Sequence, residues 1–273
     1  MTDARRSPSP PGAARIAVRT RPLLDVFDLA VRFVAVHGWA YARIAALVLP
    51  PGVALTWLAG TWGTWWLGWA VGAFAATIAQ TPFTIYASRV VFEDEVRVRS
   101  VLAASLRQLP KMVLARSVHY ACVALGALLF LVPAGWVGAT MLYLGEALAL
   151  ERSGVIGAMS RTQRLAAAAF GDTMLGLLLL VVLDASAALL GDVAGRSLLE
   201  GLLQSAAPAS GFSSGGSLLA AIGFWAFVPY AATVKFLLYL NVRTRAEGWD
   251  VQTRFAALAR RAEADAEARE AAE

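Results

Sequence analysis

The chain has 273 residues, of which 58% are apolar and 16% are charged, and its formal net charge is +5. A soluble domain has about 45–50% apolar and about 25% charged residues, so this composition excludes an ordinary soluble globular protein. A single cysteine excludes an internal disulfide, and two histidines leave little for a zinc or di-iron centre. Because the apolar residues come in long blocks, the sequence predicts an all-α integral membrane protein.

Residues 1–21 contain arginine, proline and serine without an apolar core. Such a segment buries too little apolar surface to fold, and it lacks the apolar centre of a signal peptide. We therefore expect a disordered cytoplasmic tail over 1–21 and a membrane domain over 22–250. A charged cytoplasmic tail is expected over 251–273.

Six stretches come close to or exceed the roughly 20 apolar residues that a helix needs to cross a hydrocarbon core of about 30 Å. They are, in chain order, Ala40–Ala59, Thr64–Val91, Met112–Leu131, Ala134–Leu150, Thr173–Leu190 and Leu218–Leu240. Short connections at Gly60–Gly63 and at Val132-Pro133 make the first four spans two antiparallel hairpins. The six helices are thus expected as three hairpins.

Prolines interrupt three of the spans, at Pro50-Pro51, Pro82 and Pro229. Each removes an amide donor and frees a carbonyl about four residues earlier, which predicts a kink. In a transporter such a break exposes carbonyls to an ion, whereas in other membrane helices it serves packing alone.

The basic residues predict the direction of threading. With the N-terminus inside, 23 of the 24 Lys and Arg fall on the cytoplasmic side or at the inner ends of spans, and only Arg196 falls outside. Indole rings prefer the headgroup level, and six tryptophans gather at the predicted outer ends. These are Trp57, Trp62, Trp65, Trp66, Trp69 and Trp136. Abundant alanine and a strong preference for arginine over lysine are typical of a GC-rich bacterium, so we expect a protein of the bacterial cytoplasmic membrane with both termini inside.

Each hairpin follows a short segment with helical periodicity, beginning at Val26, Val101 and Val155. Apolar residues opposite arginines predict helices that lie along the inner membrane interface. The chain then contains three parallel copies of an interfacial helix followed by a transmembrane hairpin.

Three segments carry a resemblance to a known family. They are RPLLDVFDLAVRFV from Arg21, ALERSGVIGAMSRTQRL (Ala149–Leu165) and YLNVRTRAEGWDVQ (Tyr239–Gln252). The middle pattern is matched by Glu151, Ala158, Arg161, Thr162 and Leu165. The closing pattern is matched by Arg243, Arg245, Glu247, Gly248 and Asp250, with Asn241 where an Asp is usual.

Over about residues 21–255 the chain resembles the six-helix membrane domain associated with some bacterial glycerophosphoryl diester phosphodiesterases. The phosphodiesterase itself is a separate metal-dependent barrel of about 250 residues. This chain has no room for that barrel and lacks the paired histidines and clustered carboxylates of its chemistry. The resemblance therefore implies the membrane architecture and not the activity.

No other catalytic pattern is convincing, so we expect neither an enzyme nor a cofactor. The one Gly-x-Ser-x-Gly match, Gly211–Gly215, falls in an outer loop, whereas a nucleophile elbow needs a strand before it and a helix after it. His119 in the third span is expected to be a packed polar residue, the alternative being a ligand.

Basic residues on the cytoplasmic side form a candidate surface for anionic lipid headgroups, the alternative being topology enforcement alone. They are Arg32, Arg97, Arg99, Arg107, Lys111, Arg161 and Arg164. Membrane or cytoplasmic proteins are further candidate partners, and no nucleic acid is expected. The closing motif is expected to be structural: its charges would hold the end of the last span against other cytoplasmic loops, with a C-cap turn at Gly248.

Glu146, Lys235 and Asp184 are charged residues inside predicted spans, where an isolated charge costs about 2.5–3.5 kcal/mol. Glu146 and Lys235 are predicted at similar depths, so they could form an ion pair. The alternative is that the Lys235 side chain extends to the inner headgroups. Asp184 has no basic residue at its own depth and is expected to face water or to stay neutral.

The leading functional hypothesis is a non-enzymatic scaffold or accessory protein, and the alternative is a small transporter or lipid-handling protein. A dry interior packed by small residues would favour the scaffold. A polar cavity lined by Asp184, Glu146 or Lys235 would favour transport.

Overall fold

The computed structural model describes residues 21–93, 96–151, 154–206 and 211–246. Within these ranges every regular element is helical, which confirms the all-α prediction. Five helical segments are long and apolar enough to cross a membrane, as in a multi-pass membrane protein. They are Gly38–Trp62, Val98–Leu129, Leu131–Leu150, Phe170–Leu202 and Leu218–Ala246.

The second and third helices form a hairpin, which follows the first helix directly. Helix α1 (Leu23–Val36) ends at His37, where the backbone turns to φ −101° and ψ 18°, and α2 (Gly38–Trp62) continues through both prolines without a break. The connection to α3 (Trp65–Ala79) is made by Gly63 and Thr64, and the Thr64 hydroxyl accepts a hydrogen bond from the amide of Leu67.

The predicted second span, 64–91, is interrupted close to the kink expected from Pro82, although the backbone of Gln80 keeps helical dihedral angles and its hydrogen bonds on both sides. It divides at Gln80 into α3, of 15 residues, and α4 (Thr81–Phe92), of 12 residues, and neither is long enough to cross a membrane alone. Pro82 explains the position of the break, because a proline is tolerated in the first turn of a helix, where its missing amide hydrogen has no partner to lose.

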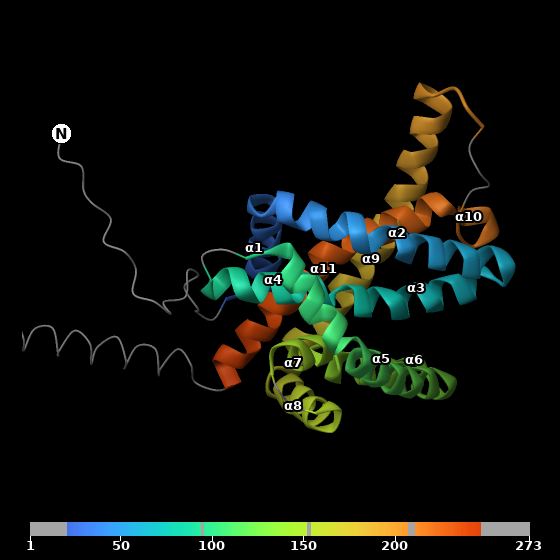
Figure 1. Ribbon diagram of the computed structural model, residues 1–273. Coiled ribbons are helices and arrows are strands. Elements are labelled where there is room, and N and C mark those ends of the chain that lie inside the picture. The colour runs from blue at the N-terminus through green and yellow to red at the C-terminus, as the bar shows by residue number, and fades with distance from the viewer. Residues whose placement is uncertain (1–20, 94–95, 152–153, 207–210, 247–273) are drawn as a thin grey trace, which may run out of the picture.

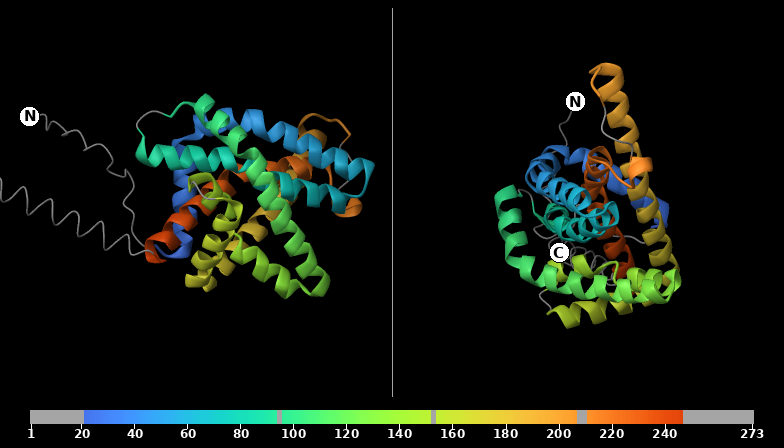
Figure 2. Two further views of the ribbon diagram at one scale, coloured as in Figure 1. Left: turned by 60° about the horizontal axis from the view of Figure 1, so that its bottom comes forward. Right: turned by 90° about the vertical axis from the view of Figure 1, so that its right-hand side faces the viewer.

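Helix α5 (Val98–Leu129) is a continuous helix of 32 residues with Pro110 inside it. The segment beginning at Val101 is therefore not a separate interfacial helix, and that part of the repeat prediction is wrong. Figure 2 shows that α5 changes direction along its length, as a helix does where a proline removes one hydrogen bond without ending the ladder.

The second hairpin turns at Phe130, whose extended backbone separates α5 from α6 (Leu131–Thr140). Residues 141–143 interrupt the span before α7 (Leu144–Leu150) begins. The segment beginning at Val155 is a separate helix, α8 (Val155–Ala168), which Ala169 divides from α9 (Phe170–Ser197).

Helix α9 passes directly into a π-helical turn, η1 (Leu198–Leu202). This end projects away from the bundle in Figures 1 and 2. A short helix, α10 (Gly211–Ser214), precedes the last helix, α11 (Leu218–Ala246).

Helix α11 lies at the centre of the bundle (Figure 1), and most of its apolar length is buried. It crosses α9 closely where two glycines meet: a Cβ on Gly223 would lie 2.2 Å from the carbonyl oxygen of Ala187. It packs against α2 where the Trp225 ring lies over Gly52, and the indole nitrogen donates to the Thr56 hydroxyl at 2.9 Å. The fold is thus organised around one apolar helix with bulky and small residues on different faces.

Candidate functional site

Three charged side chains from three helices are buried inside the protein, and their charges act on one another. Arg116 on α5, Glu146 on α7 and Lys235 on α11 are 2%, 1% and 7% exposed. The positive charges of Lys235 and Arg116 both act on the Glu146 carboxylate. We call these three residues the charge cluster.

The charge cluster is incompletely hydrogen-bonded. Arg116 Nη1 lies 3.3 Å from His119 Nδ1. In the described part of the chain, however, Glu146 Oε2, Arg116 Nε and His119 Nε2 have no hydrogen-bond partner. Buried polar atoms are normally paired, because leaving one unpaired costs about 1–3 kcal/mol and more for a charged group. Groups retained at such a cost are candidates for a functional role.

The predicted direct pair of Glu146 and Lys235 does not form within the described residues, although their charges interact. Nor does Lys235 extend to the protein surface, since it is buried. The charge of Arg116 acts on Glu146 in addition to that of Lys235.

A cavity of about 200 Å³ lies beside the charge cluster, between α3, α5, α9 and α11. Its polar lining includes Lys235, Asp184, Tyr120 and Gln80. Gln80 is 9% exposed, and its Oε1 has no hydrogen-bond partner among the described residues. The charges of Asp184 and Lys235 attract each other across this space, without an ion pair between them. Asp184 therefore faces a cavity, and Lys235 from another helix lines the same cavity.

A larger cavity of about 520 Å³ adjoins the first. The two share Ala73, Val181, Asp184 and Phe224 as lining residues. The larger one continues along α3, α9 and α11 to the loop at 211–216 and is lined mainly by apolar side chains. Lys235 follows the first residue of α11 by 17 positions, or about 25 Å along the helix. The two adjoining cavities together thus extend over most of the thickness of a bilayer core.

Two interrupted helices border the smaller cavity. Gln80, at the junction of α3 and α4, and Leu142, in the turn between α6 and α7, both line it. Interrupted membrane helices are tolerated where the backbone at the break is covered by protein or faces a polar cavity. The breaks and the cavity are therefore parts of one structural feature.

Asp192 organises the end of the larger cavity. Its carboxylate accepts hydrogen bonds from the Ser217 hydroxyl and from the Gly211 amide at 3.1 Å, and it lies 3.7 Å from Arg196. Trp69 donates its indole hydrogen to the carbonyl of Gly215 at 2.8 Å. The loop at 211–216 is thus held over the cavity by α3 and α9. The Gly-x-Ser-x-Gly match lies in this loop, and residues 211–214 of it form the short helix α10.

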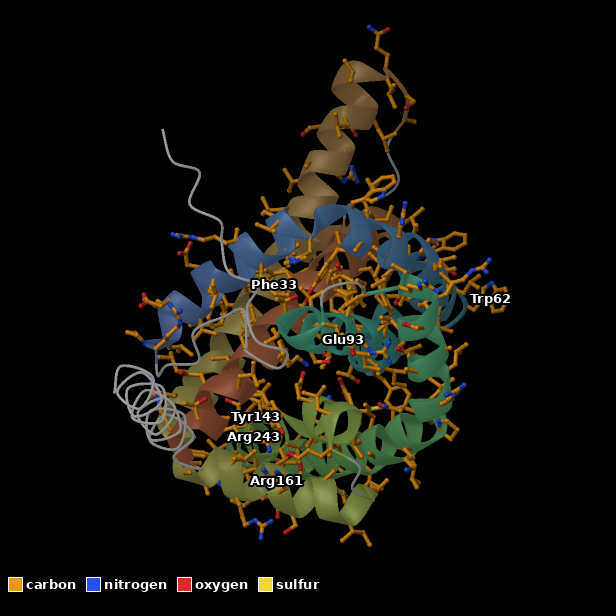
Figure 3. The ribbon with its side chains drawn as sticks, turned by 60° about the vertical axis from the view of Figure 1, so that its left-hand side comes forward. Phe33, Trp62, Glu93, Tyr143, Arg161 and Arg243 are labelled. Atoms are coloured by element: carbon orange, nitrogen blue, oxygen red, sulfur yellow. The ribbon has the colours of Figure 1, made fainter. Side chains whose placement is uncertain are left out.

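A second polar group, which we call the Glu151 network, joins the end of α11 to α8. The carboxylate of Glu151 lies 2.5 Å from Arg161 and 3.8 Å from Arg243, and it accepts a hydrogen bond from the Tyr239 hydroxyl. Figure 3 shows Arg161 and Arg243 near each other at this end of the molecule. Arg245 pairs with Asp172 at 2.6 Å. In the structure these two arginines of the closing motif therefore make structural contacts, while Glu247, Gly248 and Asp250 lie outside the described residues.

The entry segment meets the same end of α11. The amide of Arg21 donates to Asn241 Oδ1 at 2.9 Å, and its carbonyl accepts hydrogen bonds from Asn241 and Arg245. Asn241 uses its amide group both as donor and as acceptor. An aspartate, the residue usual at this place in the resembled family, would offer only acceptors when ionised.

The candidate headgroup residues are placed on the surface with one exception. Six are exposed, namely Arg32, Arg97, Arg99, Arg107, Lys111 and Arg164. Arg161 is half-buried in the Glu151 network, and Arg32 pairs with Asp28 at 2.8 Å.

Arg116, Gln80 and Asp192 were missed by the sequence analysis. Arg116 is four residues inside the predicted third span, the same distance from its inner end as Glu146 is from the inner end of the fourth. A comparison of these depths would have identified it. Gln80 and Asp192 carry no such signal, because their roles depend on which helices lie beside them.

Comparison with protein-family models, with curated proteins and with solved structures found no match to this chain. The family resemblance of the three segments stays a prediction.

Proposed function

We propose that this chain is a small transporter of the bacterial cytoplasmic membrane with six spans and both termini inside. The spans would be α2, α3 with α4, α5, α6 with α7, α9 and α11. The proposal keeps the membrane architecture of the phosphodiesterase-associated family and assigns no catalytic activity. Helices α1 and α8 would lie along the inner interface.

The two adjoining cavities carry the proposal. They lead from the loop at 211–216 to Asp184 and Lys235, beside two interrupted helices. Transporter sites typically lie near the middle of the membrane where helices are discontinuous. Charged residues inside the membrane are costly and mark substrate or ion pathways. A polar cavity, two broken spans and buried charges at one place favour transport over a passive structural role.

The two ends of the molecule differ in a way that supports an outward-facing state. The Glu151 network and the Arg245–Asp172 pair tie α8, α9 and α11 together at the proposed cytoplasmic end. At the other end the loop at 211–216 lines the larger cavity. A substrate would enter from outside and meet a closed cytoplasmic end.

The scaffold hypothesis stays as the second candidate, because the crossing at Gly191 and Gly223 is the dry, small-residue packing that it predicts. Anionic lipid headgroups are proposed partners in either case, through the six exposed basic residues. Protein partners are proposed only for the scaffold.

Accessibility of the cavity from outside tests the transporter proposal. In a Cys122→Ser background, an Ala73→Cys variant places a thiol where the two cavities meet. A membrane-impermeant methanethiosulfonate added to intact cells should label it, because the reactive thiolate forms only where water is present. The matched Leu178→Cys variant, exposed on α9 and outside both cavities, should stay unlabelled in lipid. If Ala73→Cys is as inert as Leu178→Cys, the transporter proposal fails.

A further inference from the structure

The smaller cavity presents two opposite charges that do not contact each other. Asp184 on α9 and Lys235 on α11 both line it, and their charges interact without an ion pair. A lysine and an aspartate with flexible side chains would normally close such a gap, because a direct pair inside a membrane protein is much more favourable than a distant one. In the structure the two groups come from different helices and no ion pair joins them.

The balance of charge restricts what this space accepts. The charge cluster and Asp184 together contain two cations, Arg116 and Lys235, and two carboxylates, Glu146 and Asp184. A ligand with a net charge would leave one buried charge uncompensated, which is costly in a medium of low dielectric constant. A neutral ligand with separated charges would keep the balance.

We propose that the smaller cavity binds the zwitterionic head of a small amino acid, its ammonium beside Asp184 and Gln80 and its carboxylate beside Lys235. Binding turns one long-range attraction into two short charge-assisted contacts, which are stronger than neutral hydrogen bonds. Gln80 Oε1, which has no partner among the described residues, accepts a hydrogen bond from the ammonium. This inference rests on the proposed transport function and specifies its substrate class.

The larger cavity selects the side chain of that amino acid. It opens from the smaller one at Asp184 and Phe224, and its lining is mostly apolar, with Trp69 on α3. An aromatic or branched aliphatic side chain would bury apolar surface there. The combination of a zwitterionic head and an apolar body describes an apolar α-amino acid.

Three probes that share one skeleton test the charge requirement. L-Phenylalanine carries both charges, 2-phenylethylamine lacks the carboxylate and 3-phenylpropanoate lacks the ammonium. Binding of radiolabelled L-phenylalanine is measured on the purified full chain in detergent, with the other two as competitors. We expect each competitor to bind about 10- to 100-fold more weakly, since each loses one charge-assisted contact. Equal competition by either, or no binding of L-phenylalanine, overturns the inference.

A substitution at Asp184 tests whether this residue binds the ammonium of the ligand. Asp184→Asn should weaken L-phenylalanine binding about 10- to 100-fold, because its ammonium loses a charged partner. The same change should leave 3-phenylpropanoate binding equal or tighter, because this anion has no ammonium and would now balance the excess positive charge. Asp25→Asn, which removes an exposed carboxylate on α1 outside both cavities, should change neither. If Asp184→Asn fails to fold, the competition among the three probes on the unmodified protein still tests whether both charges of the ligand are required.

Failure of this inference is distinguishable from failure of the transport proposal. If Ala73→Cys is labelled from outside but 2-phenylethylamine competes as well as L-phenylalanine, the cavity is accessible and the substrate class is wrong. If Ala73→Cys is not labelled, both proposals fail.

Discussion

Glu146 has a carboxylate oxygen without a hydrogen-bond partner among the described residues, although Arg116 and Lys235 act on its charge. Two cations around one carboxylate make the three side chains mutually dependent. Removal of the carboxylate leaves two buried positive charges, whereas removal of one cation leaves a pair behind. At the scale of single residues, the stability of this interior is therefore expected to be strongly non-additive.

Double-mutant cycles measure this dependence. Glu146→Gln should lower stability by about 1–3 kcal/mol, because two buried cations lose the carboxylate whose charge acts on them. Glu146→Gln combined with Arg116→Gln or with Lys235→Met should cost less than the sum of the single changes, by about 0.5–3 kcal/mol. Thermal unfolding in detergent provides the comparison. Strict additivity in both cycles would mean that the three charges act independently.

Helix α11 contacts its neighbours through two different surfaces, and these hold the elements together in different ways. Against α9 it uses a glycine crossing in which backbone atoms meet. At its last turns it uses Tyr239 and Arg243, which bind Glu151 between α7 and α8. The first contact depends on the absence of a side chain and the second on charge.

The glycine crossing predicts a steric effect. A methyl group from Gly223→Ala would lie 2.2 Å from the Ala187 carbonyl oxygen and 2.8 Å from Gly191 Cα, and backbone atoms cannot move aside as a side chain end does. We expect a loss of about 1–3 kcal/mol, as for overpacked cores. Gly135→Ala, where no atom lies within 4 Å of the new Cβ, is the control and should be neutral or stabilising. Equal melting temperatures for the two variants would contradict the close crossing.

The Glu151 network predicts a contrast between two charge removals. Glu151→Gln should destabilise by about 1–3 kcal/mol, because two arginines and the Tyr239 hydroxyl depend on one half-buried carboxylate. Arg245→Gln should cost less than about 1 kcal/mol, since its pair with Asp172 is 37% and 45% exposed and is screened by water. Thermal unfolding measured in 0.05 and 0.5 M salt distinguishes the two variants, because the destabilisation by Arg245→Gln should disappear at high salt. An Arg245→Gln effect as large as that of Glu151→Gln would reverse this ranking.

On the scale of the whole molecule, the turn between α2 and α3 and the end of α11 lie at opposite ends (Figure 1). The first carries Trp62, Trp65 and Trp66, and the second carries the arginines of the closing motif. This separation is what a membrane protein with a cytoplasmic basic end and an outer aromatic end requires.

Cysteine labelling of intact cells tests that orientation. In a Cys122→Ser background, Trp62→Cys and Ser214→Cys should react with an impermeant reagent added outside. Ala246→Cys at the end of α11 should react only after the membrane is permeabilised. Labelling of Ala246→Cys in intact cells would place the C-terminal end outside and overturn the proposed topology.

The sequence by itself determined the all-helical class, the positions of the long apolar helices and the hairpin at Gly63, because the length and spacing of apolar residues reflect the bilayer directly. It also anticipated that Arg243 and Arg245 would make structural contacts at the end of the last helix. The continuity of α5 through Pro110 and the burial of Arg116 where its charge acts on Glu146 were decided only by the tertiary structure. Each depends on which helices become neighbours, and the same proline or buried charge is compatible with several arrangements until a neighbour supplies the hydrogen bonds and the opposite charges.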